Sequence, residues 1–352
     1  MASLVTLEEP CAEEQSCAER GTSVTAIIPT CNRPKLVERA IRSALDQSYS
    51  PLEVVLVIDG MDERTRRVAV EMKEPRLRII ELGRNAGAAQ ARNIGVSMAR
   101  GEWVAFLDDD DEWLPRKIEV QMQAARRSSA LYPVVGSRVV VRSSEFDWIS
   151  PARLYSAGEP MSEYLFCRRK FVDGASYMQT STLLMQRELM LKIPFQAKLK
   201  RHHDWDWLLR AFAQPGVEFH VLSDALAIFN IDDGRTSIGR SLDWKVSRSW
   251  AQGIRDSFTP RAYSFFLANE CVSRAVKTKA GGAAYVSLVW EFFASGQPTP
   301  RSLLSLAGFL CLPGGVRDSM RRSVRLRRVA ARASQALQQG LRTDPGASKR
   351  IC

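Results

Sequence analysis

The chain has 352 residues, of which 45% are hydrophobic and 25% charged, enough for one large globular domain with an appendage. This composition excludes a wholly disordered chain, a collagen-like fibre and a small disulfide-rich protein. The formal charge of +11 is uneven, because the last 52 residues hold 11 basic and 2 acidic side chains and leave a body of +2. A basic excess indicates nucleic acid, an anionic membrane or phosphate-bearing ligands as partners, and here it belongs to the tail.

Residues 1–21 are acidic and lack an apolar run, which predicts a flexible leader and not a secretory signal. The seven cysteines are scattered without a Cys-x-x-Cys pair, a usage typical of a reducing compartment. No apolar run of about 20 residues occurs, and the longest apolar stretch, 303–312, is too short to span a bilayer. We therefore expect a cytoplasmic protein without a membrane-spanning helix.

Strand-like and helix-like segments alternate through the first third of the chain. The predicted strands are 24–29, 52–59, 77–80 and 102–108. The predicted helices between them are 35–46, 62–72 and 86–98. The run from Val54 to Ile58 is wholly apolar, as in a strand covered on both faces. This alternation predicts an α/β fold with a Rossmann-like, mostly parallel central sheet flanked by helices, which binds its ligands at the carboxyl ends of the strands.

The pattern after Pro115 is less regular. It predicts a helix at 116–127, a strand at 134–142, a loop-rich stretch to about residue 175, a strand within 177–185, helices at 187–191 and 204–212, and two strand-like pieces in 217–231. From about residue 240 onward the chain is predicted to be helical.

Four consecutive carboxylates, Asp108 to Asp111, follow the predicted strand 102–108. Such neighbours repel one another unless a cation or hydrogen-bond donors neutralise them. Asp108 and Asp110 are separated by one residue, so they can share a hard divalent ion, which prefers oxygen ligands. The alternative is a solvated acidic turn that caps the next helix, but the position at the carboxyl end of a strand favours the metal.

Asp59 also ends a predicted strand and is followed by Gly60. It is suited either to bind a base imide or ribose hydroxyl, or to form an ordinary Asp-Gly turn. The segment 83–95, GRNAGAAQARNIG, is similar to a glycine-rich nucleotide loop but has neither GxGxxG nor GxxxxGK[ST]. Its small residues alternatively allow a helix to pack closely on the sheet.

Asp204 and Asp206 lie two residues apart at the start of the predicted helix 204–212, so their side chains point to different sides. We expect one to face a cleft and the other to face solvent. A partly desolvated carboxylate here can act as a general base, whereas the alternative role is to cap the helix. His202 and His203 precede it, but with only three histidines in the chain a metal-ligand role is not favoured.

Six segments, taken in order, resemble the family 2 glycosyltransferases, which have a GT-A fold. They are VTAIIPTCNRP, LDQS, VLVIDG, NAGAAQARNIG, FLDDDDEWLP and HHDWDWLLR. The resemblance covers about residues 22–235. It implies a catalytic domain at 22–240, with a nucleotide-binding half at 22–115 and an acceptor half at 116–240. A helical C-terminal region at 241–352, with a basic amphipathic tail, follows.

The resemblance also implies the reaction. One sugar would pass from a nucleotide-diphosphate sugar, with UDP-sugars favoured, to a hydroxyl of a glycan or lipid-linked glycan, with inversion and with Mg²⁺ or Mn²⁺. By position, the nucleotide-sugar contacts are Pro29, Thr30, Asp59, Asp108 and Asp109. The metal ligand is Asp110, the catalytic base is Asp204, and the acceptor side includes Gln179, Thr180 and His203.

Two positions depart from the family pattern, because Ile58 replaces the first of two aspartates and His203 replaces the Gln or Glu that often precedes the base. The chain has no QxxRW motif and no predicted membrane bundle, both expected of processive synthases, so we expect addition of single sugars in bacterial cell-surface polysaccharide biosynthesis. A nucleotidyltransferase on the same scaffold would need a basic glycine-rich loop where PTCNRP stands. A nucleic-acid-binding protein would need a recognition motif that the body lacks, so no nucleic acid is expected.

The tail pattern predicts a further helix. In residues 321–341, apolar side chains recur at helical spacing beside several arginines. Such a helix either lies on an anionic membrane surface or packs on the catalytic body with its basic face in water. The resemblance favours the membrane, so we expect peripheral attachment to the inner face of the cell membrane through residues 301–352.

Overall fold

The computed structural model describes residues 22–168, 178–199, 201–231, 243–317, 319–320 and 322–323. The predicted leader 1–21 and the part of the tail beyond residue 323 lie outside these residues. The strands are β1 Val24–Thr30, β2 Leu52–Ile58, β3 Leu77–Glu81, β4 Trp103–Phe106, β5 Glu112–Trp113, β6 Tyr132–Arg142, β7 Trp148–Ser150, β8 Leu183–Gln186 and β9 Val217–Asn230.

The helices follow the prediction closely in the first half of the chain. They are α2 Pro34–Leu45, α3 Glu63–Glu71, α4 Ala88–Met98, α5 Lys117–Arg127, α6 Met161–Phe166, α7 Arg187–Lys192, α8 His203–Phe212, α9 Trp244–Gly253, α10 Pro260–Phe266, α11 Ser273–Lys277, α12 Gly282–Ala294 and α13 Pro300–Cys311. Short 3₁₀ turns, η1 at Thr180–Thr182 and η3 at Arg255–Ser257, and a π-helical segment, η4 at Leu267–Val272, complete the set.

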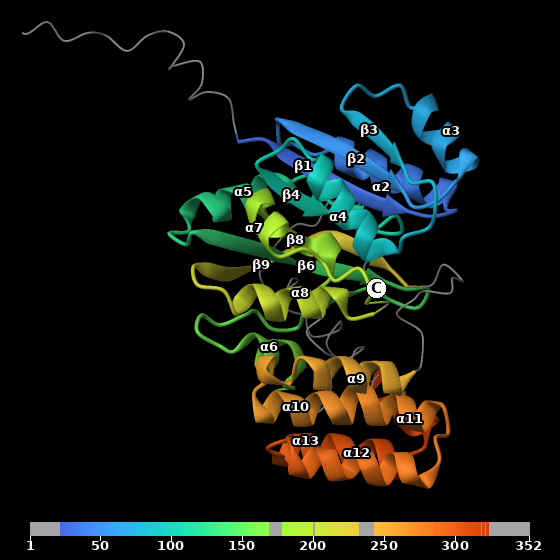
Figure 1. Cartoon of the computed structure of the whole chain (residues 1–352), viewed down its shortest axis with the longest axis vertical. Coiled ribbons are helices and arrows are strands. Elements are labelled where there is room, and N and C mark those ends of the chain that lie inside the picture. Colours follow the sequence, from blue (N-terminus) through green and yellow to red (C-terminus); the bar gives the residue numbers. More distant parts are fainter. Residues whose placement is uncertain are drawn as a thin grey trace, which may run out of the picture.

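The strands form one nine-stranded sheet in the order β3-β2-β1-β4-β8-β6-β9-β5, with β7 beside β6 (Figure 1). Strands β1 to β4 are parallel, and β8 is antiparallel to both β4 and β6, so β6 runs in the same direction as β4. Since β9 is parallel to β6, six of the nine strands share one direction. The predicted α/β fold with a mostly parallel sheet is confirmed. Asp59 and the acidic turn follow β2 and β4, the two neighbours of β1.

Helix α4 packs very closely on β1 and β2. Ala91 is fully buried, and a Cβ placed on Gly95 would lie only 2.4 Å from Ile27 Cγ2. A larger side chain at residue 95 would therefore push the helix off the sheet. The small residues of segment 83–95 thus serve close helix–sheet packing, one of the two roles considered for them.

Two details after residue 140 were not predicted. The stretch expected to be loop-rich contains β7 and α6, both too short to show a clear period in sequence. Residues 217–231, expected to form two pieces, instead form the single strand β9. Its pairing with β6 shifts register where Leu222 faces Ser137 and Ala225 faces Arg138, so the exposed Ser223 and Asp224 bulge out without ending the strand.

The C-terminal helices stack at one end of the molecule, beyond α8 (Figure 1). They share one hydrophobic cluster with α6 and α8, in which Phe258 stacks on Phe166 with ring centroids 5.1 Å apart. Trp250 of α9 packs there beside His202. The predicted helical C-terminal extension is confirmed over the described residues, and it supports the helix that carries Asp204. No helix in the described part of the chain is both long enough and apolar enough to cross a membrane.

Candidate functional site

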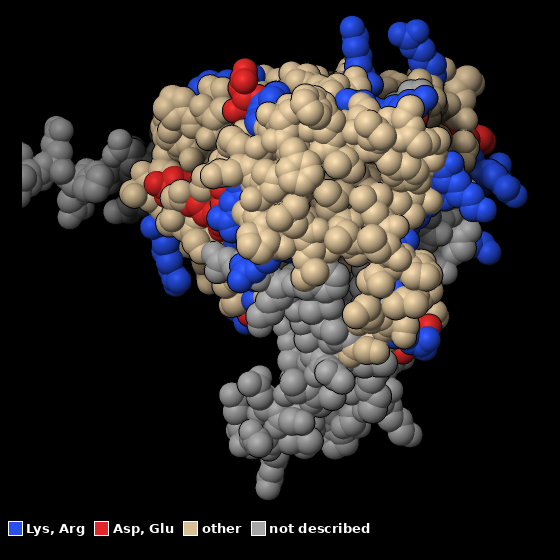
Figure 2. All heavy atoms as spheres, turned by 90° about the horizontal axis from the view of Figure 1, so that it is seen from below, with Lys and Arg blue, Asp and Glu red and all other residues tan. Residues whose placement is uncertain are grey.

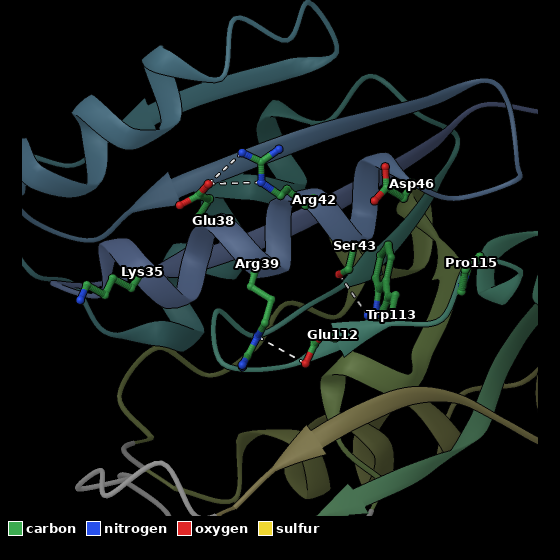
Figure 3. A pocket seen from close by; sticks show the side chains of 9 residues that line it. All are labelled: Lys35, Glu38, Arg39, Arg42, Ser43, Asp46, Glu112, Trp113 and Pro115. Atoms are coloured by element: carbon green, nitrogen blue, oxygen red, sulfur yellow. Dashed lines mark hydrogen bonds and ion pairs between the residues drawn. The ribbon is translucent and has the colours of Figure 1, made fainter. Parts of the chain in front are cut away.

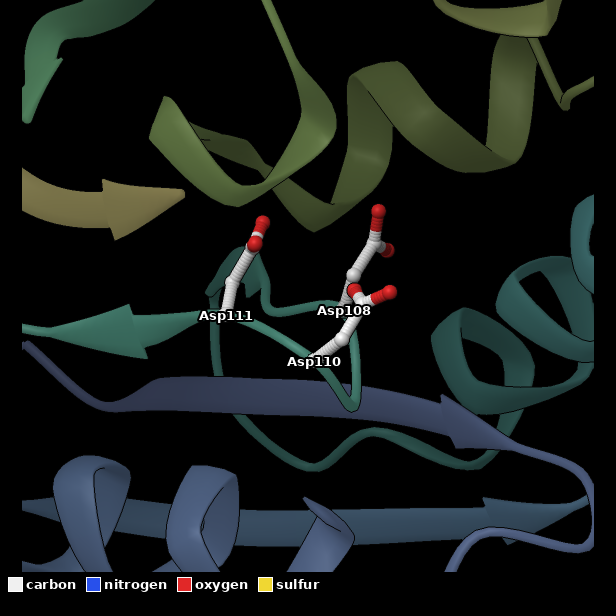
Figure 4. A group of neighbouring side chains, drawn as sticks. All are labelled: Asp108, Asp110 and Asp111. Atoms are coloured by element: carbon white, nitrogen blue, oxygen red, sulfur yellow. The ribbon is translucent and has the colours of Figure 1, made fainter. Parts of the chain in front are cut away.

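The acidic turn after β4 gathers three carboxylates on one side (Figure 4). One oxygen each of Asp108, Asp110 and Asp111 lies within 4.8 Å of the others. Ser181 holds the turn, since its Oγ donates to Asp111 Oδ2 at 2.5 Å and accepts from the Asp108 amide at 3.1 Å. The predicted pair of Asp108 and Asp110 is thus brought together. Asp111 joins it, although sequence reasoning assigned it no role.

The donor set fits a hard divalent cation. Asp111 is 1% exposed, and its Oδ1 has no hydrogen-bond partner among the described residues. Burial and then the charges of Asp108 and Asp110 raise its pKa well above the ordinary value, which marks the cost of placing these carboxylates together. Arg33, Arg39 and Arg92 also contact the turn, Arg39 through the Asp110 carbonyl oxygen at 2.9 Å. Three clustered carboxylates, one of which has an unpaired buried oxygen, suit a divalent ion with oxygen ligands.

Asp109 is not one of the three clustered carboxylates, and it fixes the turn to β1. Its Oδ2 accepts from Thr30 Oγ1 at 2.8 Å, and its Oδ1 pairs with Arg33 Nη1 at 2.8 Å. Both Asp109 and Thr30 are about 5% exposed or less, and burial raises the pKa of Asp109. Pro29 precedes them within the fully buried strand β1. The structure gives Asp109 and Thr30 a positioning role, and their contact with a nucleotide sugar stays a prediction.

Asp59 organises the loop before α4. Its two carboxylate oxygens accept the amides of Ala86 at 2.6 Å and Gly87 at 2.9 Å. Gly87 has a φ of 90°, which a residue with a side chain rarely adopts, so the glycine lets the loop turn onto the carboxylate. Each oxygen keeps a second lone pair, so the predicted bond to a base remains compatible with this geometry.

Asp204, the predicted base, lies in the first turn of α8. Its side chain is 26% exposed, and burial raises its pKa above the ordinary value. The backbone amide of Thr180 donates to the carboxylate, whereas Oδ1 makes no hydrogen bond among the described residues. An unpaired carboxylate oxygen with a raised pKa is suited to accept a proton.

Arg92 connects the acidic turn to the base, and sequence reasoning missed it. Its Nη2 pairs with Asp108 Oδ1 at 2.5 Å, and its Nη1 lies 3.0 Å from His203 Nε2. Arg92 is 3% exposed, which is rare for an arginine without a defined role. The signal in the sequence was an arginine on α4, within an otherwise small and apolar helix face that packs on the sheet.

His203 is held between Arg92 and Asp204. Its Nε2 lies 3.1 Å from Asp204 Oδ1, but that oxygen makes no hydrogen bond, so the nitrogen is placed to accept from Arg92. Burial lowers the pKa of His203, which favours the neutral ring that such acceptance requires. The structure therefore shows His203 positioning Arg92 beside the base. A contact with the acceptor stays a prediction.

The expectation that one aspartate of the pair faces solvent is wrong. Asp206 is fully buried, and its carboxylate accepts from Arg210 Nε at 2.7 Å and from Trp250 Nε1 at 3.2 Å. Helix α8 is covered by α9 on that side, so the side chain that sequence reasoning placed in water anchors the C-terminal helices. That Asp204 faces a cleft stays a prediction.

Gln179 and Thr180, predicted on the acceptor side, lie at the start of η1. Thr180 is fully buried, and its Oγ1 lies 3.5 Å from Asp108 Oδ1. Its backbone amide also donates a hydrogen bond to Asp204, so Thr180 lies between the acidic turn and the base. Gln179 Oε1 has no hydrogen-bond partner among the described residues. Neither geometry tests an acceptor contact, so both assignments stay predictions.

An open groove of about 420 Å³ lies apart from these carboxylates, between α2 and residues 112–115 (Figure 3). Its walls carry ion pairs, with Arg42 Nη2 at 2.8 Å from Glu38 Oε1 and Arg39 Nε at 3.3 Å from Glu112 Oε1. Since these charges already neutralise one another, we assign no ligand to the groove.

We expect Arg92→Ala to lower the free energy of unfolding by about 2–3 kcal/mol, because it removes charge-assisted hydrogen bonds from a buried site. Urea unfolding measures this loss. Arg66→Ala on α3 is the control, since its side chain is 49% exposed and a surface change costs within about 0.5 kcal/mol. Equal stability of the two variants would show that Arg92 does not hold the acidic turn to α8.

Comparison with known proteins agrees with this geometry. The model of the family "Glycosyl transferase family 2" matches residues 25–193. A putative teichuronic acid biosynthesis glycosyltransferase, TuaG of Bacillus subtilis, is 34% identical over 64% of this chain and 84% of its own. The amylovoran biosynthesis glycosyltransferase AmsB of Erwinia amylovora is 25% identical over 76% of this chain and 91% of its own.

Solved structures share the fold. The crystal structure of S. aureus TarS matches 81% of this chain and 50% of its own, with a TM-score of 0.53 and 18% identity. TarS 1–349 in complex with UDP-GlcNAc matches 78% of this chain and 82% of its own, with a TM-score of 0.53 and 21% identity. This likeness confirms the predicted GT-A fold.

Proposed function

Because the chain belongs to glycosyltransferase family 2, we propose that it transfers one sugar from a nucleotide-diphosphate sugar to a hydroxyl of a glycan or lipid-linked glycan, with inversion. The observation that carries this proposal is the unpaired oxygen of Asp204, held beside the acidic turn through Arg92 and His203. A proton acceptor and a diphosphate-binding turn are the two groups that such a transfer needs next to each other.

The donor side lies at the carboxyl ends of β1, β2 and β4. We assign the nucleotide to Pro29, Thr30 and Asp59, and the ribose and diphosphate to the turn at Asp108 and Asp109. Uridine is favoured, because the structurally similar TarS was solved with UDP-GlcNAc and the free lone pairs of Asp59 suit a base imide.

The transfer step uses Asp204. The acceptor hydroxyl gives its proton to the Asp204 carboxylate while its oxygen bonds to the anomeric carbon, and the bond from that carbon to the diphosphate breaks on the opposite face. Arg92 stays protonated and holds Asp108 in place. Neutral His203 accepts a hydrogen bond from Arg92 and so fixes its position. The fixed geometry lowers the cost of orienting these groups during the reaction.

Asp110, with Asp108 and Asp111, would hold the Mg²⁺ or Mn²⁺ ion. When bound, such an ion supplies positive charge that stabilises the departing nucleoside diphosphate. Without it, the clustered carboxylates of the turn would repel a diphosphate.

The setting is proposed from the relatives. TuaG and AmsB are named for teichuronic acid and amylovoran biosynthesis, and a third relative, WcaA of Escherichia coli, is named for colanic acid biosynthesis. We infer that this chain also builds a bacterial cell-surface polysaccharide. It would act at the inner face of the cell membrane, attached through the basic residues of 301–352, most of which lie outside the described residues.

A ligand screen tests the proposal. A UDP-sugar at 100 times its own Kd, in the presence of Mn²⁺, is expected to raise the free energy of unfolding of the full chain by about 2.7 kcal/mol. This raises Tm by several degrees. Asp59→Asn should reduce this shift, whereas the exposed Asp46→Asn should not. If no nucleotide sugar raises Tm or donates its sugar, the proposed function is wrong.

A further inference from the structure

The exposed residues of α12 are all apolar or glycine. Its most exposed large residues are Val286, Trp290 and Phe293, which are 71%, 74% and 53% exposed and lie at positions i, i+4 and i+7 of one helix face. The other exposed residues of α12 are Gly282, Ala283 and Ala294. A tryptophan left three-quarters in water is unusual on a surface that nothing covers.

Helix α13 repeats this arrangement. Leu303, Leu304 and Leu310 are 39%, 53% and 43% exposed, and Arg301 at the first turn is the one exposed charged residue of the helix. The described part of the chain has fourteen exposed large hydrophobic side chains, and eight of them lie within residues 286–320. The apolar exposure of this protein is therefore concentrated at one end.

The inner faces of both helices pack against the body with apolar side chains, beside the buried polar residues Glu291, Ser302 and Ser305. Leu288 and Phe292 of α12, and Leu306 and Phe309 of α13, are buried, and both helices pack on η4. Each helix is thus anchored to the body on one side and presents apolar side chains on the other. With 13 and 12 residues, the helices are too short to span a bilayer, but such outer faces are suited to lie on a membrane surface.

The charge around this end is positive. The described residues from 277 to 323 include five basic side chains, those of Lys277, Lys279, Arg301, Arg317 and Arg322, and one acidic side chain, that of Glu291. Glu291 is buried and binds Arg248 Nε at 2.6 Å. Lys277, Lys279 and Arg301 are exposed. Seen from below, this end shows a broad uncharged area with Lys and Arg side chains, and some Asp and Glu side chains, toward its edges (Figure 2).

We propose that the outer faces of α12 and α13 form a docking surface for an anionic lipid bilayer. Trp290 and Phe293 would enter the interfacial region, and Lys277, Lys279 and Arg301 would meet the lipid phosphates. A second copy of the chain fits less well, because a symmetric contact would bring two basic borders together. This surface lies outside the predicted tail helix and does not depend on the transfer chemistry.

Co-sedimentation of the full chain with lipid vesicles tests the proposal. Binding is expected for phosphatidylcholine vesicles that contain phosphatidylglycerol, to weaken with salt, and to be weak for phosphatidylcholine alone. The double variant Trp290→Ser/Phe293→Ser should bind at least about tenfold more weakly, because two apolar side chains are lost from the contact. The control Val70→Ser/Leu191→Ser, from exposed sites on α3 and α7, should bind like wild type.

Three outcomes would overturn the docking surface. The first is a full chain that does not bind anionic vesicles. The second is a double variant that binds normally while Arg325→Glu/Arg327→Glu/Arg328→Glu alone abolishes binding, which would assign the contact to the tail. The third is a dimer that disappears only in the double variant, without vesicle binding. Transfer to a soluble acceptor should be unchanged in the double variant, which separates this test from that of the proposed function.

Discussion

Replacing Asp204 with Asn is expected to lower kcat for sugar transfer by about 10²- to 10⁴-fold, the range typical of a lost general base. Asn keeps the size of the side chain and an acceptor for the Thr180 amide, but it cannot take a proton from the acceptor hydroxyl. Binding of the donor should change little, because the carboxylate makes no contact with the predicted nucleotide pocket. Steady-state kinetics with a UDP-sugar and measurement of the donor Kd together separate the two effects.

The stability of the same variant gives an independent check. The folded state raises the pKa of Asp204 above its ordinary value of 3.8, so the ionised carboxylate destabilises the fold above that pKa. At neutral pH the Asn variant should therefore unfold with an equal or higher free energy than wild type. The difference should disappear below about pH 4, where wild-type Asp204 is protonated in both states. The kcat/KM of wild type should fall as the pH is lowered through this raised pKa.

Asp206→Asn is the matched control, because it lies on the same helix but serves packing. Losing the charge that binds Arg210 and Trp250 should lower Tm while most of the turnover remains at a temperature where the variant is folded. Asp204→Asn should thus lose turnover without losing stability, whereas Asp206→Asn should lose stability and keep most of its turnover. If Asp204→Asn retains full transfer activity, Asp204 is not the base, whatever its effect on stability.

Local sequence patterns were sufficient to predict the donor half of the fold. The strands β1 and β2 each contain an uninterrupted apolar run, and α2 has apolar residues at helical spacing. The carboxyl ends of parallel strands lie at one edge of the sheet. This is why Asp59 and Asp108 were found without coordinates. The strand β9 was misread because a bulge at Ser223 interrupts its pattern but not its pairing.

Long-range contacts explain what the sequence could not predict. Arg92 acts through residues 16 and 111 positions away, and nothing near it in the chain reveals these partners. Asp206 was placed in water because helical period gives the direction of a side chain, whereas its burial depends on α9, about 40 residues later. Asp111 could have been predicted as a member of the carboxylate group, since it directly follows three other aspartates in the chain. Its unpaired oxygen was visible only in the structure.

Removing the divalent ion with EDTA is expected to lower turnover by about 10²-fold or more, because the ion contributes several kcal/mol toward the charge of the departing diphosphate. Added Mg²⁺ or Mn²⁺ should restore it. Asp110→Ala should reproduce the loss and resist restoration. It should also abolish the rise in Tm that Mn²⁺ produces in wild type, a readout that does not depend on catalysis.

Glu112→Gln is the matched control for the metal site. Glu112 follows the acidic turn directly, but its carboxylate pairs with Arg39 at 3.3 Å and lies outside the group of three. The Glu112 variant should therefore keep its Mn²⁺-dependent Tm shift and its turnover. Asp111→Asn should weaken the shift, since it replaces the carboxylate whose buried oxygen has no hydrogen bond within the described residues. Full turnover in EDTA would contradict the metal assignment.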